Sequence, residues 1–272
     1  MDKKIYYNSS LPRAGSTLIS NIIAQNPKFY CTPTSGLSSL ILNSKSAYNS
    51  GEAFKAQDSK EMENAFLSFA KHGMQGYFKG ITDKSHILDK SRDWAINYGL
   101  LEKIQDNPKV ICMVRDVRSI YSSMEKNFRK NPHKENHVQN VQKLVGTTLD
   151  KRIDLWADGL PVGIAMDRLK DIFQQGLDKH MLFIRYEDLM SNPHDVMNRI
   201  YDYLHVDRFE HSFDKIKQLT HEDDTVHGIY GDHTLREEFK MLPNDFEQVL
   251  GIELSNKIKN TYPWFFNKFY YE

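Results

Sequence analysis

The sequence predicts an α/β fold, a three-layer α/β/α sandwich in which helices cover both faces of a central, mainly parallel sheet. Four segments rich in β-branched and aromatic residues have the composition of buried strands, at about 5–11, 86–90, 109–114 and 181–186. Helical patterns separate these segments, and such alternation is typical of parallel sheets with right-handed crossovers. The 272 residues, 40% hydrophobic and 26% charged, suffice for one sizeable core, so we expect a single domain over 1–272.

The first predicted unit, residues 5–27, is a strand followed by a tight loop and a helix. Pro12 and Gly15 force the turn, and apolar residues recur at helical spacing after it. Such a loop leaves the NH groups of residues 15–17 unpaired at the positive end of a helix, and Arg13 adds a full charge beside them. This order predicts a phosphate site. The alternative is an ordinary turn with an arginine on the surface.

The units that follow are predicted from the same patterns. Residues 29–32 suit a short strand, 43–51 a loop, and 52–78 a long helix with an apolar stripe of Phe54, Met62, Phe66, Phe69 and Ala70. The strand at 86–90 ends in a cluster of charged residues. Because ligands of open α/β sheets bind at the carboxyl edge of the strands, we expect Lys90 and Arg92 where a cofactor bound by Arg13 would lie, and a solvated loop is the alternative for Arg92.

Composition excludes several classes of function. The 36 basic and 36 acidic residues cancel, so no overall field favours nucleic acid or an anionic membrane, and any anion binding must be local. Only Cys31 and Cys112 are present, which gives no disulfide framework and is typical of a reducing compartment. No apolar run has the length of a signal peptide or membrane span. We expect a soluble, cytoplasmic protein, and nothing in the sequence indicates its oligomeric state.

The first loop lacks the motif of an ATP or GTP site. In G-x-x-x-x-G-K-[ST] a lysine precedes the hydroxyl residue, whereas here Gly15 is followed directly by Ser16 and Thr17. The loop P-R-A-G-S-T-L instead resembles the 5′-phosphosulfate loop of sulfotransferases that use 3′-phosphoadenosine 5′-phosphosulfate (PAPS). The resemblance implies a P-loop NTPase-like sulfotransferase fold and a set of cofactor-binding residues, Arg13, Ala14, Gly15, Ser16, Thr17 and Leu18.

A second motif of the same family follows about a hundred residues later. Arg115 leaves a predicted strand and Ser123 lies eight residues further on, as in the 3′-phosphate motif R-[DN]-x-[RK]-[DS]-x-x-x-S. A guanidinium fork and a hydroxyl on two elements can grip a terminal phosphate, which neither a 5′-mononucleotide nor ATP would supply there. Two motifs in the right order make coincidence improbable.

Three further positions resemble the family less closely. Lys90 matches the strand-end lysine that lies against the transferring sulfuryl group, and Tyr186 in R-Y-E-D-L matches a tyrosine near the adenosine and its 3′-phosphate. An interface tyrosine with a satisfied hydroxyl is the alternative for Tyr186. Residues 226–233, V-H-G-I-Y-G-D-H, are similar to the loop R-K-G-x-x-G-D-W, which implies that His227 and Gly228 bind the cofactor. Valine replaces the arginine of that loop, so Arg236 is an alternative contact.

The resemblance implies a PAPS-dependent sulfotransferase of the EC 2.8.2 type that moves a sulfuryl group to a hydroxyl-type acceptor without a metal. Arg13 and Lys90 would stabilise the leaving 5′-phosphate as catalytic residues. The general base is not predicted: Arg92 replaces the family's histidine, and 32–36 lacks the glutamate of other members. The remaining candidates are His86, Asp89, Asp93, His227 and His233.

The acceptor is left open by the sequence. Small molecules, glycans and lipids are all compatible, and specificity is expected in the segments without motifs, about 32–80 and 127–180. His133 and His137 lie in a basic loop of the second segment, where a mobile gate is favoured over a metal site. Two alternatives to the enzyme remain, a noncatalytic relative that binds PAPS or its product 3′-phosphoadenosine 5′-phosphate (PAP), and an ATP-using P-loop kinase.

Overall fold

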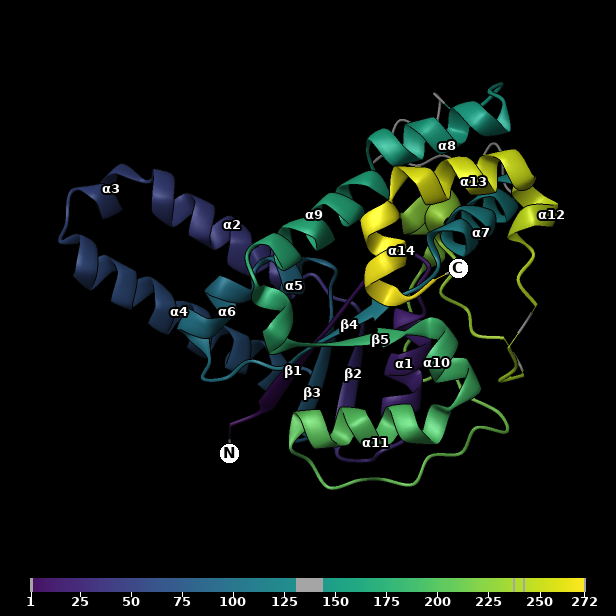
Figure 1. Cartoon of the computed structure of the whole chain (residues 1–272). Coiled ribbons are helices and arrows are strands. Elements are labelled where there is room, and N and C mark those ends of the chain that lie inside the picture. The colour runs from purple at the N-terminus through teal and green to yellow at the C-terminus, as the bar shows by residue number, and fades with distance from the viewer. Residues whose placement is uncertain (1, 131–143, 237, 242, 272) are drawn as a thin grey trace.

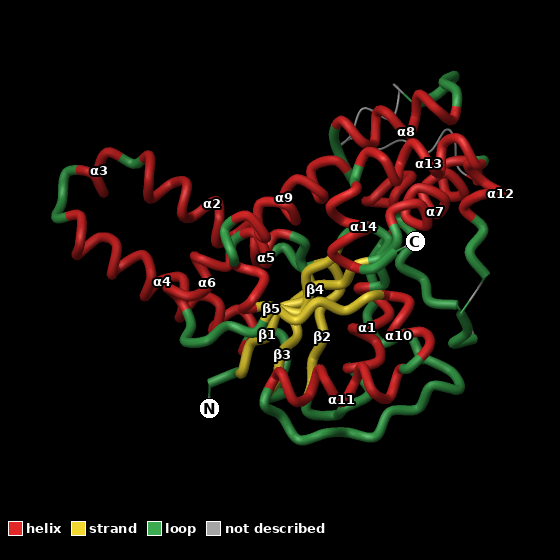
Figure 2. The backbone as a smooth tube through the Cα atoms, viewed as in Figure 1, coloured by secondary structure: helices red, strands yellow, loops and turns green. Residues whose placement is uncertain are grey.

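The protein is described by a computed structural model that covers residues 2–130, 144–236, 238–241 and 243–271. A five-stranded parallel sheet of order β2-β3-β1-β4-β5 runs through the centre, with helices on both sides of it (Figures 1 and 2). The strands are β1 (Lys4–Ser10), β2 (Phe29–Thr34), β3 (His86–Lys90), β4 (Val110–Val114) and β5 (Met181–Arg185). The predicted α/β fold is therefore confirmed. The predicted strands agree to within one residue at each end, except that β2 extends two residues beyond the predicted 29–32.

The helices are short to medium in length. They comprise α1 (Ser16–Ile23), α2 (Leu37–Ser50), α3 (Glu52–Lys55), α4 (Ser59–Lys79), α5 (Asp93–Ile96), α6 (Tyr98–Ile104), α7 (Val117–Lys130), α8 (Leu149–Asp158), α9 (Gly163–Gln174), α10 (Tyr186–Ser191), α11 (Pro193–Leu204), α12 (Phe246–Leu250), α13 (Ile252–Thr261) and α14 (Pro263–Phe269), and the 3-10 helices η2 (Leu177–His180) and η3 (Asp224–Tyr230). His133 and His137 lie outside the described residues.

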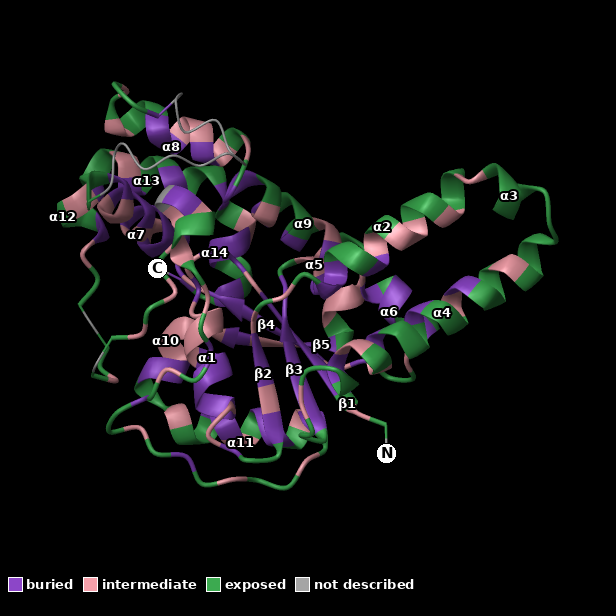
Figure 3. Ribbon diagram, turned by 180° about the vertical axis from the view of Figure 1, so that it is seen from behind, coloured by how far each residue is buried: buried purple, intermediate pink, exposed green. Residues whose placement is uncertain are grey.

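Alternation of side chains along the strands builds two apolar cores. Tyr6, Leu88 and Ile111 face one way and pack with α1, α7 and α11. Their neighbours Ile5, Ile87 and Val110 face the other way and pack with α2, α4 and α6. Buried residues fill the three central strands on both faces, whereas β2 and β5 at the sheet edges are buried only in part (Figure 3).

The order of the strands positions the site. β1 pairs with β3 from Lys4↔His86 to Asn8↔Lys90, and with β4 from Tyr7↔Val110 to Ser10↔Met113. The chain therefore leaves β1 towards one side of the sheet and returns through β3 and β4 on both flanks of β1. A crevice forms at the carboxyl edge of such a sheet where the order of the strands reverses, which is where the loops after β1, β3 and β4 meet.

Two predictions between β2 and β3 are wrong. The segment 43–51 is not a loop, because α2 continues to Ser50 and its serines bond within the helix, Ser44 Oγ to Leu40 O at 2.8 Å and Ser50 Oγ to Ser46 O at 2.9 Å. The helix predicted over 52–78 is divided, because the Asp58 carboxylate accepts the NH groups of Lys60 and Glu61 and starts α4 anew.

The predicted apolar stripe of this region is only partly buried. Phe66 and Ala70 belong to the core, whereas Phe54 and Phe69 are 42% and 60% exposed. The reason is that α2, α3 and α4 form an arm that extends away from the sheet, so that only one side of its base packs against the body (Figures 1 and 3).

Candidate active site

The loop between β1 and α1 has a backbone that requires glycine at one position. Gly15 precedes α1 with φ 88°, in the left-handed region, and a Cβ placed there would lie 2.8 Å from Cδ2 of Tyr186. Tyr186, the first residue of α10, therefore packs directly on the loop. Arg13 also has a positive φ of 57°, which turns the chain sharply before the helix begins.

The start of α1 offers backbone donors. Gly15 provides no side-chain cap, and the first turn contains no acidic residue. The Asn8 amide donates to Ser16 O at 3.1 Å and to Ser20 Oγ at 2.9 Å, which fixes the helix against β1. The positive end of α1 is thus held rigidly at the carboxyl edge of the sheet, where an anion is stabilised.

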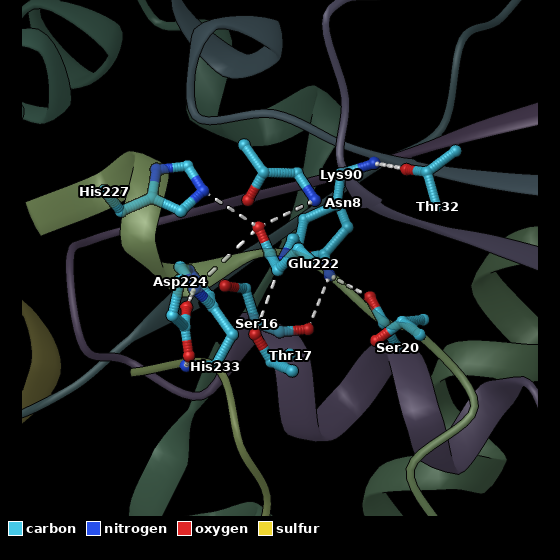
Figure 4. A network of polar contacts seen from close by, with 12 residues as sticks. Asn8, Ser16, Thr17, Ser20, Thr32, Lys90, Glu222, Asp224, His227 and His233 are labelled. Atoms are coloured by element: carbon cyan, nitrogen blue, oxygen red, sulfur yellow. Dashed lines mark hydrogen bonds and ion pairs between the residues drawn. The ribbon is translucent and has the colours of Figure 1, made fainter. Parts of the chain in front are cut away.

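Lys90, at the carboxyl end of β3, lies beside this loop. Its Nζ donates to Thr17 Oγ1 at 3.1 Å and to Glu222 Oε1 at 2.8 Å, and its side chain is 6% exposed (Figure 4). Burial lowers the pKa of Lys90, and the Glu222 carboxylate opposes that shift. The predicted catalytic lysine and the predicted phosphate loop are therefore in direct contact.

Glu222 is the centre of a polar cluster that the sequence did not predict. Its Oε2 lies 3.2 Å from His227 Nε2 and 3.8 Å from His233 Nδ1, while His233 Nδ1 lies 2.6 Å from Asp224 Oδ1 (Figure 4). Burial would raise the pKa of Glu222, but the hydrogen bond and charge of Lys90 outweigh it and lower the pKa to about 2. The carboxylate is therefore ionised at neutral pH.

This cluster has the donors of a metal site as well. One ligand atom each from Glu222, His227 and His233 lie within 4.8 Å of one another, and imidazole with carboxylate suits ions such as Zn²⁺. The Lys90 ammonium already balances the Glu222 charge at 2.8 Å, so the cluster also holds together without an ion. The expectation that the reaction needs no metal stays a prediction.

The two predicted phosphate motifs meet in the structure. Arg13 Nε donates to Ser123 Oγ at 3.1 Å, and Arg115 Nη1 donates to the Arg13 carbonyl oxygen at 3.1 Å. The Arg115 guanidinium also stacks on the Tyr186 ring, 4.5 Å from its centroid. The β1–α1 loop and the β4–α7 turn thereby form one continuous surface with two guanidinium groups.

Arg115 is desolvated within this surface. Burial lowers its pKa, and the charges of Arg13 and Arg236 act in the same direction, which places Arg236 near this end of the site. Arg115 Nε has no hydrogen-bond partner among the residues that the structure describes. A buried donor of this kind is costly unless a ligand satisfies it.

Carboxylates from one segment cover both predicted catalytic cations. Asp232 accepts from Arg13 through its backbone oxygen at 2.8 Å and through its carboxylate, while Glu222 accepts from Lys90. Residues 222–232, which include η3, therefore lie across the site, with His227 beside Glu222 and Gly228 at a kink of φ 57°. The structure shows no ligand contact for His227 or Gly228, whose role stays a prediction.

A pocket of about 320 Å³ opens at the same edge of the sheet. Thr34 and residues of α2 line one side, and residues of α9 line another, so both segments expected to carry specificity contribute. Arg92 is exposed and lines the pocket, while Asp93 accepts from Arg168 Nη1 at 2.7 Å. The wall also carries Ser9, Ser38, Ser91, Leu160 and Ile164.

Two candidates for the general base lie elsewhere. His86 opens β3, at the opposite end of the strand from Lys90. Asp89 is fully buried and accepts from Trp94 Nε1 at 2.7 Å, and burial raises its pKa to about 6. Neither side chain bonds to Thr17 in the first turn of α1, in contrast to Lys90.

Comparison with solved structures supports the fold. The chain superposes on mouse sulfotransferase SULT7A1 complexed with PAP with a TM-score of 0.55 at 17% identity, covering 96% of this chain and 83% of that one. A sulfotransferase domain from the curacin biosynthetic pathway gives a TM-score of 0.51 at 18% identity, with 100% and 99% covered. A sulfotransferase from Alicyclobacillus acidocaldarius gives 0.50 at 12% identity, with 97% and 96% covered.

Sequence comparison assigns the family. No curated protein shows significant similarity to the sequence. Among the described residues, no helix combines the length and apolar character needed to cross a bilayer. The model of the sulfotransferase family matches residues 9–211, well over half of the chain and including both phosphate motifs. The chain therefore belongs to the sulfotransferase family.

Proposed function

We propose that the protein transfers a sulfuryl group from PAPS to a hydroxyl group of a small-molecule acceptor. The observation that carries this proposal is the contact between the two phosphate motifs, in which Arg13 bonds to Ser123 at 3.1 Å and Arg115 bonds to the Arg13 carbonyl at 3.1 Å. Two guanidinium groups beside the start of α1 suit a nucleotide with phosphates on both its 3′ and 5′ positions.

The cofactor would lie along this surface. The NH groups at the start of α1, with the Ser16 and Thr17 hydroxyls, are proposed to bind the 5′-phosphosulfate, and Arg13 adds charge there. Arg115 and Ser123 would bind the 3′-phosphate, since Arg115 Nε has no other partner in the described chain. Because His227 already contacts Glu222, we favour Arg236 over His227 as an additional 3′-phosphate ligand.

Sulfuryl transfer would place a new negative charge on the 5′-phosphate. The acceptor oxygen attacks sulfur, the bond from sulfur to the 5′-phosphate oxygen breaks, and that oxygen keeps the electron pair. Lys90, Arg13 and the α1 backbone donors would stabilise the new negative charge, and loss of one such donor costs roughly 2.7–4 kcal/mol of transition-state stabilisation. Lys90 would have to exchange its Glu222 contact for the phosphosulfate.

The pocket lined by α2 and α9 is proposed to bind the acceptor. Its volume of about 320 Å³ is at the lower end of the range for small-molecule sites. A glycan or lipid acceptor would have to leave most of its length outside the pocket. Arg92, which lines this wall, cannot serve as a base because a guanidinium stays protonated.

Transfer of radiolabelled sulfate tests the proposal. The protein is incubated with ³⁵S-labelled PAPS and a panel of phenols, alcohols, sugars and hydroxylated lipids, and labelled products are separated by chromatography. Transfer to at least one acceptor, lost in Lys90→Met, is the expected result. Tight PAP binding without any transfer would favour a noncatalytic relative. Transfer of phosphate from ATP and magnesium would instead establish a kinase.

A further inference from the structure

We propose that Glu222 is the catalytic base that accepts the proton of the acceptor hydroxyl, an inference that rests on the function proposed above. Attack by a hydroxyl group on sulfur must release a proton, and no motif in the sequence assigns a group to receive it. The geometry points to a carboxylate that reaches the reacting centre from a segment far along the chain.

Glu222 bonds to Lys90, which contacts the start of α1, and to a residue of the pocket wall. Its Oε1 accepts from Lys90 Nζ at 2.8 Å, and the same Nζ reaches Thr17 Oγ1 at 3.1 Å. Its Oε2 accepts from the backbone NH of Thr34 at 3.4 Å, and Thr34 lines the pocket. The Glu222 side chain is only 8% exposed, so water screens its charge little and its interaction with a bound hydroxyl group is strong.

The other candidates are less well placed. Asp93 is paired with Arg168, and Asp89 is fully buried with Trp94 as its donor. His233 is held by Asp224, whose two carboxylate oxygens contact its Nδ1 at 2.6 Å and its backbone NH at 2.9 Å. Of the carboxylates in the described chain, Glu222 is the one that contacts Lys90.

The proton transfer balances without another reactant. The acceptor O–H bond breaks as oxygen bonds to sulfur, the proton goes to a Glu222 oxygen, and the electron pair of the broken S–O bond stays on the 5′-phosphate. Lys90 neutralises Glu222 before the reaction; once Lys90 turns to the phosphosulfate, the carboxylate loses that counter-charge and becomes a stronger base. His227 Nε2, at 3.2 Å and partly exposed, can pass the proton on to solvent.

Two other roles for Glu222 make different predictions. As a clamp it would only hold Lys90, and as a metal ligand it would act with His227 and His233. A general base matters only when the acceptor arrives protonated, because an acceptor that is already ionised has no proton to lose. Acceptors that differ in acidity therefore separate the base from the clamp, and a chelator separates both from a metal ligand.

The test compares phenol with 4-nitrophenol, which is largely ionised at mildly alkaline pH, in single-turnover transfer from ³⁵S-labelled PAPS. In Glu222→Gln, whose amide oxygen can still accept from Lys90, we expect the rate with phenol to fall about 10²- to 10⁴-fold. The rate with 4-nitrophenol and the PAP dissociation constant should stay within a few fold of wild type. Glu210→Gln, an exposed glutamate between α11 and η3, is the matched control.

Each other outcome overturns the inference in a defined way. An equal loss with both phenols would make Glu222 a clamp, and an unchanged rate with phenol would remove it from the chemistry. Loss of wild-type activity with EDTA, restored by Zn²⁺, would assign the cluster to a metal. PAP binding without transfer to these phenols or to any acceptor of the panel above would remove the inference together with enzymatic activity, whereas a wild type that binds no PAP refutes the proposed function itself.

Discussion

The contact between Gly15 and Tyr186 makes a quantitative prediction for the phosphate loop. Gly15 has φ 88°, and a Cβ there would lie 2.8 Å from the Tyr186 ring. The left-handed backbone alone costs an alanine roughly 1–2 kcal/mol. Moving the ring, which also stacks on Arg115, adds an overpacking cost of about 1–3 kcal/mol. Gly15→Ala should therefore lower the free energy of unfolding by about 2–5 kcal/mol.

A double-mutant cycle separates the two costs. In the Tyr186→Ala background the clash is absent, so Gly15→Ala should cost only the backbone contribution of about 1–2 kcal/mol. Gly176→Ala is the matched control, because Gly176 has φ 67° with no atom within 4 Å of the added Cβ. Urea unfolding followed by circular dichroism measures all four proteins and the control. Equal costs of Gly15→Ala in both backgrounds would refute the predicted contact.

Three further predictions concern charged groups. Asp232→Asn removes a partly exposed partner of Arg13, a pair worth at most about 1 kcal/mol, so calorimetry should show PAP binding up to about fivefold tighter; weaker binding would mean that Asp232 helps to form the site. Lys90→Met should lower the transfer rate about 10²- to 10³-fold while PAP still binds, and an unchanged rate would exclude Lys90 from the chemistry. Burial raises the pKa of Asp89 from 3.8 in the unfolded chain to about 6 in the fold. The folded state therefore favours the protonated carboxyl group, and this contribution to the free energy of unfolding is present below pH 3.8 and is lost as pH rises through 6. Asp89→Asn should therefore stabilise the fold at pH 7 by about 1–3 kcal/mol and by little near pH 4; equal gains at both pH values in urea unfolding would contradict this.

The sequence was sufficient to predict the sheet and the place of the charged residues at its carboxyl edge. The three central strands are short and buried on both faces, and their composition therefore identifies them without tertiary information. The positions of Arg13, Lys90 and Arg115 were predictable because each lies at or soon after the carboxyl end of a strand, and the carboxyl ends of parallel strands share one edge. The contacts of Arg13 with Ser123 and of Arg115 with Arg13 follow from that topology.

Contacts made by the later segment were not predictable. Glu222 bonds to Lys90 across 132 positions of sequence and Asp232 bonds to Arg13 across 219, and no local pattern specifies either pairing. The run H-E-D-D at 221–224, directly before the loop that resembles a family motif, was the available signal. The polar composition of 43–51 also led to the wrong prediction of a loop. The segment is helical, and its serine hydroxyls donate to carbonyl groups of the preceding helical turn.

The central claim, that this surface binds a nucleotide phosphorylated at both ends, is tested most directly by calorimetric titration of wild type and Arg115→Ala with PAP, ADP, AMP and ATP with magnesium. We predict that PAP alone binds tightly to wild type, stabilises it by about 2.7 kcal/mol at a hundredfold excess over its dissociation constant, and binds Arg115→Ala much more weakly. Binding of ATP as tight as that of PAP, or PAP binding that Arg115→Ala leaves unchanged, would contradict the account.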